Sequence, residues 1–569
     1  MKIKSYLSKH KKLFIIVSIS LIVISLLGGT YAMFQRLDKA EYANNYRTGL
    51  LQILFDDTSE GLGGVISVEG AVPMSDSDGV NSTPYKFKII NQGNLDYKFD
   101  LKLVIDADYT STHGCSDNQL NADYIMVKFN DEEPVTLSSL SDNVIKSDIE
   151  LKVGQDVTYE LRAWLKEGTP NTEIGKHYHG KLTTNGNAIY TEYVEPNAPV
   201  LAEGMIPIAY DGTNWVKADT NNTNNNWYNY GNKMWANAVM VTSSTRDTYM
   251  NADVGTIVSE ADVLAYYVWI PRYKYQLFNA TYASGTSPQL MDVVFENGTS
   301  TTGTVTCTYA SNGKETCTNK SDGNWYTHPA FTMINASGNK KELKGIWVAK
   351  FEVSGSTTAP RVKPGVSSSL NITVANMYST GKLFRSTNYL TINGANESDS
   401  HMMKNIEWGA VAYLKQSNYG LGITDITIND SGSYTGGGTG TSYKTNIGQS
   451  TTGNITGVYD MSGGAFEYVM GNYNKTKGSS GLTVTGVPAE HIDIYSGTSV
   501  SASHLGDATG ETAGWYSDSV GFVNSSYPWF IRGGNYVDGD DAGVFDFYDF
   551  DGGAYSSGGF RAVLSTTGA

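Results

Sequence analysis

The stretches WFIRGG, residues 529–534, and GGFRAVL, residues 558–564, bracket the C-terminal part of this chain. Each combines an apolar run with an arginine and two glycines, and glycine permits the tight turns and close backbone approaches that end a strand. Between them, the chain is rich in Asp, Tyr, Phe, Ser and Gly. Aromatic residues offer large contact area at low entropic cost, and small polar residues offer adaptable contacts. The pattern predicts a binding loop, residues 532–561, between two strands.

The candidate ligand contacts in this loop are its polar and aromatic side chains. They are Tyr536, Asp538, Asp540, Asp541, Asp546, Tyr548, Asp549, Phe550, Asp551, Tyr555, Ser556 and Ser557. Clustered carboxylates suit hard cations, but their spacing does not fit the D-x-[DN]-x-[DN]-G calcium loop. We predict no metal site and no cofactor, and calcium stays open as an alternative. Another alternative is a plain polar surface loop that its phenylalanines anchor.

The residues around this loop are predicted to be scaffold. Arg532 and Arg561 lie in apolar or small-residue strands, as do Asp460 and Glu467. A buried arginine is usually paired with a carboxylate in bidentate geometry. We expect at least one of the arginines to pair with Glu467 or Asp460. The scaffold set is Arg532, Gly533, Gly534, Arg561, Asp460 and Glu467.

Length and composition restrict the class of protein. At 569 residues the chain exceeds one core, so about two to four domains are expected. Gly (61 residues) and Tyr (38) are abundant while charged residues make up 17%, which favours a β-rich extracellular protein over a helical cytosolic enzyme. The formal net charge of −16 argues against nucleic acid as a partner, because phosphate would be repelled.

Residues 1–34 have the pattern of an export segment. Five lysines precede an apolar run at 13–27, and Thr30 and Ala32 provide the small residues of a cleavage site. The apolar stretch is also long enough to span a bilayer, so a signal peptide and a membrane anchor are both open. Either one places the rest of the chain at the extracellular face of the membrane or in the medium.

Short alternating runs predict that residues 35–192 form an all-β sandwich. The runs at 85–90 and 97–104 are separated by a polar turn and predict a β-hairpin. Further strands are expected at 124–129, 148–153, 156–165 and 179–184. His177 and His179 are assigned to an exposed strand face. Residues 193–205 carry two prolines and no periodic pattern, and we predict a linker there.

The third predicted domain, residues 206–566, has aromatic strands and long polar loops. Ser259 is a candidate N-cap for a short helix at 259–265. Residues 407–414 have helical spacing, with Asn405 as their candidate N-cap. Strands are expected at 266–275 (interrupted by Pro271), 345–353 and 457–469.

Two of the three cysteines are placed to form a disulfide. Cys307 and Cys317 stand symmetrically about Asn312-Gly313, a strong hairpin-turn dipeptide. They would face each other across two strands, and an oxidising compartment would join them. Cys115 has no assigned role.

Two family resemblances add to these expectations. The junction TYAMF (30–34) with KIINQGNLDYKFDLKL (88–103) resembles the TasA/camelysin group of surface and biofilm-matrix proteins, which implies export and fibre assembly. The motifs GIWVAKFEVSG, IEWGAVAYLKQSNYG, GVYDMSGGAFEYV, FIRGGNY and GGFRAVL resemble, in order, the formylglycine-generating enzyme (sulfatase-modifying factor) family. That resemblance implies an irregular α+β C-type-lectin-like fold for residues 206–566.

The same resemblance weighs against catalysis. Enzymes of that family bind copper through a late cysteine pair, and this chain has no cysteine after Cys317. Iron-dependent sulfoxide synthases of the wider family have a three-histidine site, and His328, His401, His491 and His504 lie too far apart in the sequence to indicate one here. We therefore predict no catalytic residues and no oxidase activity.

The sequence as a whole predicts an exported bacterial surface protein. A membrane-anchored β-sandwich would carry a lectin-like domain that binds an extracellular protein or glycan through its C-terminal loop. The loop composition also resembles the variable proteins of diversity-generating retroelements, in which this segment is hypervariable. The alternatives are a sulfatase-modifying-factor-type oxidoreductase and a biofilm-matrix or fibre protein.

Overall fold

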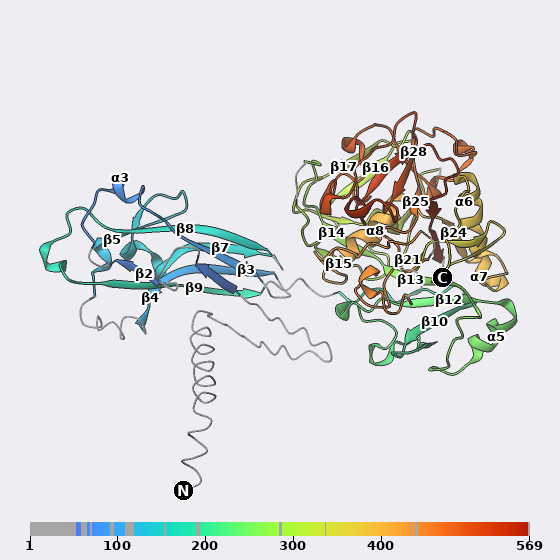
Figure 1. Ribbon diagram of the computed structural model, residues 1–569, viewed down its shortest axis with the longest axis horizontal. Helices are drawn as coiled ribbons and strands as arrows, with labels where there is room; N and C mark the ends of the chain where they lie inside the picture. Colours follow the sequence, from blue (N-terminus) through green and yellow to red (C-terminus); the bar gives the residue numbers. More distant parts are fainter. Residues whose placement is uncertain are drawn as a thin grey trace, which may run out of the picture. The chain divides into compact units, whose positions relative to one another are not determined.

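The computed structural model of the chain describes residues 53–57, 65–68, 71–91, 96–107, 119–152, 155–188, 194–283, 287–335, 337–432, 434–437 and 442–566. The chain is mostly β, and it divides into two compact units between Thr191 and Glu192 (Figure 1). The predicted export segment and Cys115 lie outside the described residues. None of the described helices has the length and apolar character needed to cross a bilayer.

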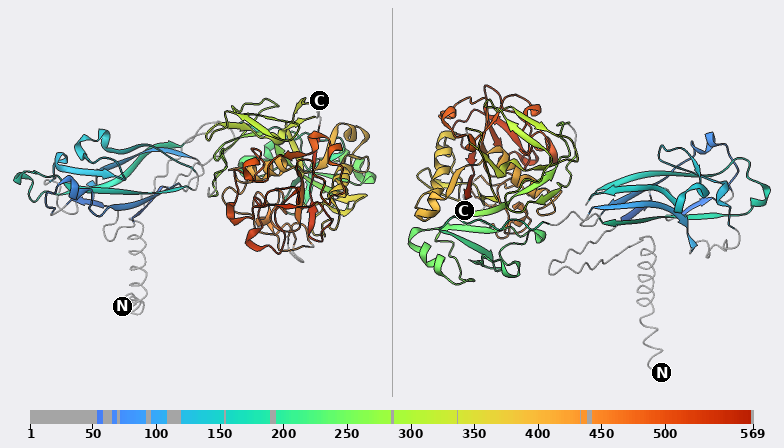
Figure 2. Two further views of the ribbon diagram at one scale, coloured as in Figure 1. Left: turned by 90° about the horizontal axis from the view of Figure 1, so that it is seen from above. Right: turned by 180° about the vertical axis from the view of Figure 1, so that it is seen from behind.

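Two antiparallel sheets build the first unit around a shared hydrophobic core. One has the order β1 (Ile53–Asp57), β3 (Tyr85–Asn91), β8 (Asp156–Leu165), β5 (Ile125–Phe129) and β6 (Val135–Thr136). The other has the order β2 (Val65–Val68), β9 (Tyr178–Ala188), β4 (Tyr97–Ile105) and β7 (Val144–Leu151). The long strands β8 and β9 run along the unit (Figures 1 and 2). Among its described residues, the unit also holds the short α-helix α3 (Asp76–Gly79).

The predicted hairpin of the first unit is wrong, although both of its strands are present. β3 pairs with β1 and β8, whereas β4 pairs with β9 and β7, so the two strands lie in different sheets. Both strands bury alternate residues, and Phe87 and Phe99 belong to the same core. Alternation fixes which face of a strand is buried, but not which strand it pairs with.

The exposed face predicted for His177 and His179 is also wrong. His179 is fully buried and His177 is partly buried. β9 pairs with β2 on one side and β4 on the other, and Tyr178 and Gly180 next to His179 are buried too. An inner strand leaves little of its surface to solvent at this point.

A seven-stranded antiparallel sheet forms the centre of the second unit. Its order is β11 (Trp215–Lys217), β10 (Met205–Tyr210), β12 (Asn237–Val241), β13 (Val263–Pro271), β21 (Gly345–Ala349), β30 (Ala562–Thr566) and β24 (Ser398–Met402). A second sheet contains β26 (Asp493–Tyr495), β25 (Phe466–Tyr473), β27 (Trp529–Arg532), β28 (Phe547–Phe550) and β29 (Gly558–Phe560). β25 is parallel to β26 and β29, and antiparallel to β27.

Smaller sheets and a few helices complete the second unit. The small sheets are β15 (Val293–Phe295)–β14 (Tyr273–Gln276)–β18 (Trp325–Thr327), β16 (Thr306–Tyr309)–β17 (Glu315–Thr318), β19 (Thr332–Ile334)–β20 (Lys340–Glu342) and β22 (Ser354–Ser356)–β23 (Ala359–Arg361). The α-helices are α5 (Ser243–Asn251), α6 (Val374–Gly381), α7 (Ile392–Asn396) and α8 (Asn405–Lys415). α6 and α7 lie beside β24 (Figure 1).

Three local predictions need correction. The strand expected at 457–469 begins only at Phe466, as β25, and residues 457–465 form bends and irregular backbone. The helix expected at 259–265 is absent. Val263 and Leu264 are the first two residues of strand β13 and are buried, and residues 259–262 form a turn before it. Burial of β-branched and aliphatic side chains in a sheet outweighs a capping signal of a few residues. The helix at 407–414 is present as α8, but its N-cap is Lys404, whose backbone N–H donates to Glu407 at 2.8 Å.

The predicted linker, 193–205, is not a free connection in its described part. Asn197 is buried, and its side chain donates to the carbonyls of Gly298 (2.7 Å) and Lys344 (3.0 Å). Val200 accepts a hydrogen bond from the Trp347 indole at 2.7 Å. The stretch is therefore packed on the second unit, because its carbonyl and amide groups find partners there.

Helix α8 is buried along its whole length, so its neighbours restrict the size of its residues. Gly409 faces the backbone of the 506–507 turn, where an added Cβ would lie 1.9 Å from the Gly506 carbonyl oxygen. Only glycine fits this approach without moving the helix or the turn.

We predict that G409A destabilises the second unit by about 1–3 kcal/mol, because overpacking outweighs the roughly 1 kcal/mol that Gly→Ala gains inside a helix. Urea unfolding of the whole chain measures the change. G486A is the matched control, since an added Cβ there has no atom within 4 Å. Equal stabilities for both variants would contradict the close approach.

Candidate functional site

The C-terminal segment connects the two large sheets of the second unit. β27 pairs with β25 and β28, and β29 pairs with β25. After Arg561 the chain enters the seven-stranded sheet as β30, between β21 and β24. The segment predicted as one loop therefore contains two strands of its own, β28 and β29.

Arg561 makes the ion pair that the sequence predicted for one of the two arginines. Its Nε donates to Glu467 Oε2 at 3.1 Å and its Nη2 donates to Glu467 Oε1 at 2.5 Å. Nη1 donates to the Ala349 carbonyl at 2.8 Å, and Nη2 to the Tyr459 carbonyl at 2.9 Å. The bidentate pair is buried and holds β21, β25 and the β29–β30 junction together.

Two further buried carboxyls surround this pair. Burial, followed by repulsion from Asp460 and Glu467, holds the pKa of Glu352 well above its usual value. Burial also raises the pKa of Asp460, although Arg561 opposes the shift. Burial raises the pKa of Glu467 to about 7 as well, while Arg561 opposes the shift. Glu467 is the carboxyl that Arg561 contacts in bidentate geometry. Asp460 instead accepts from Asn429 (3.0 Å) and the Gly436 N–H (2.7 Å).

Arg532 is held by neutral oxygens rather than by an ion pair. Its guanidinium donates to Asn405 Oδ1 at 3.0 Å and to the carbonyls of Asp507 and Ala508. It also lies over the rings of Trp408 and Phe547, at 5.5 and 5.7 Å from their centroids. Burial lowers its pKa to about 10, so the group stays charged at neutral pH.

Asp546, predicted to contact a ligand, is buried in the scaffold instead. Its Oδ1 accepts from the Gly534 N–H at 3.1 Å, and its side chain lies beneath the turn that follows β27. Gly534 has φ 62°, and an added Cβ would meet Ala542 at 2.5 Å. Burial holds the pKa of Asp546 well above its usual value. Composition alone does not separate such a turn-fixing aspartate from a surface aspartate.

The exposed part of the segment is concentrated around the turn at 535–541 and the start of β28. Tyr536 (42% exposed), Val537 (69%) and Tyr548 (47%) expose large side chains. Asp538, Asp540 and Asp541 are exposed as well. Among the described residues, the hydroxyls of Tyr536 and Tyr548 have no hydrogen-bond partner. These side chains remain available to a ligand.

Residues 519–521 connect the two exposed parts, and the sequence did not single them out. Ser519 N–H donates to the Asp541 carbonyl at 3.0 Å, and Gly521 N–H donates to the Phe547 carbonyl at 2.7 Å. Val520 between them is 46% exposed. We call the set Val520, Tyr536, Val537, Asp538, Asp540, Asp541 and Tyr548 the aromatic–acidic surface.

The later candidates make internal contacts. Asp549 accepts from Asn524 Nδ2 at 2.5 Å, and Asp551 accepts from the Tyr555 hydroxyl at 3.0 Å. The rings of Phe550 and Tyr555 pack 5.0 Å apart. Ser557 is partly buried and accepts from Phe466 N–H through its carbonyl, whereas Ser556 is exposed. The contacts favour a supporting role for most of this group.

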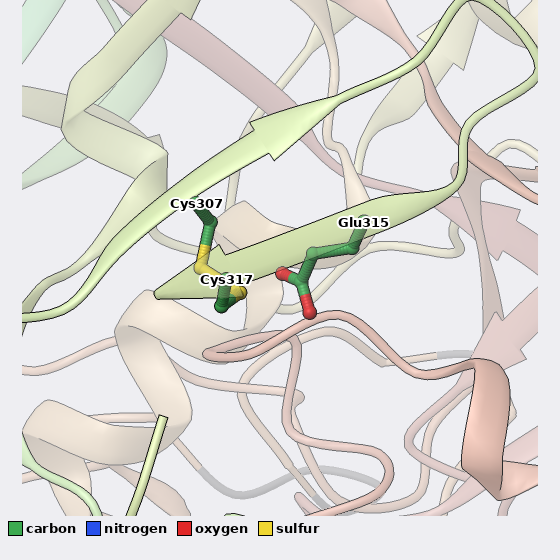
Figure 3. Close-up of side chains that lie close together, drawn as sticks. All are labelled: Cys307, Glu315 and Cys317. Carbon is green, nitrogen blue, oxygen red and sulfur yellow. A yellow bond between two sulfur atoms is a disulfide. The ribbon is translucent and has the colours of Figure 1, made fainter. Parts of the chain in front are cut away.

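The cysteine hairpin has the predicted geometry and borders a pocket. Cys307 and Cys317 occupy paired positions of β16 and β17 and are joined by a disulfide (Figure 3). The Glu315 carboxyl lies beside the sulfurs, and burial raises its pKa to about 7. A pocket of about 540 Å³ is lined by this hairpin and by residues 484–489, together with Lys404, Asp493 and His504. Its walls mix apolar and charged side chains.

Two of the histidines that are distant in the sequence lie together in the structure. The rings of His401 and His491 stack with centroids 4.8 Å apart, and the Asp399 carboxylate contacts both. Sequence reasoning missed this pair, because the two histidines are distant in the chain. His328 and His504 lie elsewhere, packed on Tyr275 and Tyr495 respectively.

No protein-family model matches the chain, and no curated protein matches it.

We predict that E467Q destabilises the second unit by about 3–5 kcal/mol, because it leaves the buried Arg561 without its counter-charge. Chemical unfolding of the whole chain measures the loss. E260Q is the matched control: it breaks the solvent-exposed Lys444–Glu260 pair, which should cost less than about 1 kcal/mol. A loss for E467Q no larger than that for E260Q would refute a central role of the Arg561 pair.

Proposed function

We propose that this protein is an exported bacterial surface protein that binds an extracellular protein or glycan through the aromatic–acidic surface. In this proposal the first unit is a β-sandwich of TasA/camelysin type. The second unit is a C-type-lectin-like domain related in fold to formylglycine-generating enzymes. The Cys307–Cys317 disulfide supports an oxidising location.

The observation that carries the proposal is the contrast between this surface and the scaffold beneath it. Tyr536, Val537 and Tyr548 are exposed, while Arg532 and Phe547 next to them are fully buried. The buried contacts hold the backbone in place, so the exposed side chains are presented with little ordering cost on binding. Exposed tyrosines on a fixed backbone are typical of recognition surfaces.

The chemistry of the surface favours a ligand with apolar faces and positive or hydrogen-donating groups. Tyr536 and Tyr548 offer ring faces, which pack on sugar rings or on aliphatic and guanidinium groups. Asp540 and Asp541 offer carboxylates that accept from hydroxyl, amine or guanidinium donors. The Asp538 carboxylate already accepts from the backbone N–H and Nδ2 of Asn535. A strongly anionic ligand would be repelled.

We propose that the domain is non-catalytic. Its resemblance to formylglycine-generating enzymes lies in scaffold motifs such as the ones that carry Arg532 and Arg561. The cysteine pair that would bind copper has no counterpart after Cys317. Turnover of a cysteine-containing peptide by the whole chain in the presence of copper would support the enzyme alternative instead.

We predict that Y536A/Y548A loses binding to targets that the wild-type chain recognises. Arrays of glycans and of purified surface proteins, probed with the whole chain, identify those targets, and titration then measures affinity. Removing two aromatic contacts should weaken binding by about tenfold or more.

The matched control is I392A, which truncates another exposed apolar side chain of the second unit, on α7. It should retain wild-type affinity. Binding that survives Y536A/Y548A but not I392A would place recognition elsewhere on the unit.

We also propose that the segment 532–561 is diversified. The exposed positions carry Tyr, Asp, Val and Ser, residues that mutation of template adenines in asparagine codons produces. We predict a reverse-transcriptase gene and a near-copy of this segment, differing at adenines, beside the coding sequence. Sequencing the locus decides: if neither is present, the segment is not diversified, although the binding proposal stands.

A further inference from the structure

A cluster of two histidines and an aspartate lies in the second unit, away from the aromatic–acidic surface. Asp399 Oδ2 is 2.7 Å from His401 Nδ1 and 2.9 Å from His491 Nε2. One ligand atom from each residue lies within 4.8 Å of the other two. The three residues come from β24 and from the 3-10 turn Ala489–His491, so the tertiary fold creates the cluster.

The outer nitrogen of each histidine is held by a separate partner. His401 Nε2 lies 2.9 Å from Glu407 Oε1, and Glu407 also accepts from the Lys404 N–H at 2.8 Å. His491 Nδ1 lies 3.2 Å from the Tyr378 hydroxyl. Metal-binding histidines commonly have this arrangement, in which a carboxylate or hydroxyl fixes the ring and its tautomer while the other nitrogen faces the metal.

The cluster is enclosed but reachable. The Asp399 side chain is 17% exposed and the His491 side chain 9%, whereas His401 is almost fully buried. Arg385 Nη1 lies 3.9 Å from Asp399 Oδ1, the oxygen that does not contact the histidines. Lys341 and Glu490 also act on this region, and Lys382 Nζ lies 4.4 Å from the centroid of the Tyr378 ring. Arg385 compensates the charge of Asp399 and leaves Oδ2 directed at the two rings.

We propose that Asp399, His401 and His491 form a binding site for a divalent transition metal, with zinc as the metal that best fits the ligands. Two imidazoles and one carboxylate are a common zinc ligand set, and three protein ligands leave a fourth position for water or another ligand. Calcium and magnesium prefer oxygen ligands and are disfavoured. This site is independent of the ligand-binding surface and of any copper chemistry.

Metal binding requires a small rearrangement. With zinc bonds of about 2.0–2.1 Å, tetrahedral ligand atoms lie roughly 3.4 Å apart. The Asp399 oxygen must therefore move away from His401 Nδ1 by about 0.7 Å and from His491 Nε2 by about 0.5 Å, and the hydrogen-bond protons between them must leave to solvent. Glu407 and Tyr378 can stay in place during this change, because they contact the opposite edges of the rings.

Zinc titration of the whole chain, after EDTA treatment and dialysis, tests the proposal by competition with a chromogenic chelator. We expect about one zinc ion per chain.

H491Q keeps a hydrogen-bonding side chain but removes the ligand geometry, and D399N removes the anionic ligand. Each should weaken zinc binding by about 100-fold or more, and the positioning variant Y378F by about tenfold. H177Q, which alters a histidine of the first unit, is the matched control and should bind like the wild type.

Two further measurements keep the result independent of folding defects. Thermal unfolding in EDTA must give H491Q and wild type the same midpoint, and zinc should raise the midpoint of the wild type alone. Zinc-edge X-ray absorption of the wild-type complex should show two imidazole ligands. A folded wild-type chain that retains no zinc, or one that binds zinc no better than H491Q, overturns the proposal and leaves the cluster as a hydrogen-bonded network.

Discussion

The buried ion pair between Arg561 and Glu467 is the interaction on which the second unit depends. It connects the junction of β29 and β30 to β25 and, through the Ala349 carbonyl, to β21. These strands belong to both large sheets, so the pair links the last strand of the seven-stranded sheet to the second sheet. Because an unpaired guanidinium at that depth would cost several kcal/mol, the pair is a large contribution to the stability of the C-terminal topology.

The C-terminal segment 532–561 contains both buried residues that hold the scaffold together and exposed residues. The ends of the segment carry Arg532 and Arg561, both fully buried. Asp546 fixes the turn between them by accepting from Gly534, so part of the middle is scaffold as well. Tyr536, Val537 and Tyr548 are exposed and lie outside the hydrophobic core. The proposed recognition surface can therefore change its side chains at little cost to the core.

The second unit contains a histidine pair and a pocket in addition to the aromatic–acidic surface. Buried charged groups need partners, and here the partners come from distant parts of the chain, as Glu407 does for His401 and Tyr378 for His491. The histidine pair arises in this way. The pocket beside the disulfide hairpin is likewise lined by segments that are distant in the sequence. Neither overlaps the aromatic–acidic surface, so recognition and metal binding would be separate properties of one unit.

The sequence by itself determined the local features: the strands at 85–90 and 97–104, the buried helix at 407–414, the paired cysteines and an arginine that needs a carboxylate. Each follows from periodicity, turn residues or charge, which act over a few residues. Only the tertiary structure decided that β3 and β4 lie in different sheets, that Asp546 is buried, and that His491 meets Asp399 across 92 residues of sequence. The physical reason is that strand pairing and side-chain burial depend on contacts between residues far apart in the chain, and a local pattern carries no information about its distant partner.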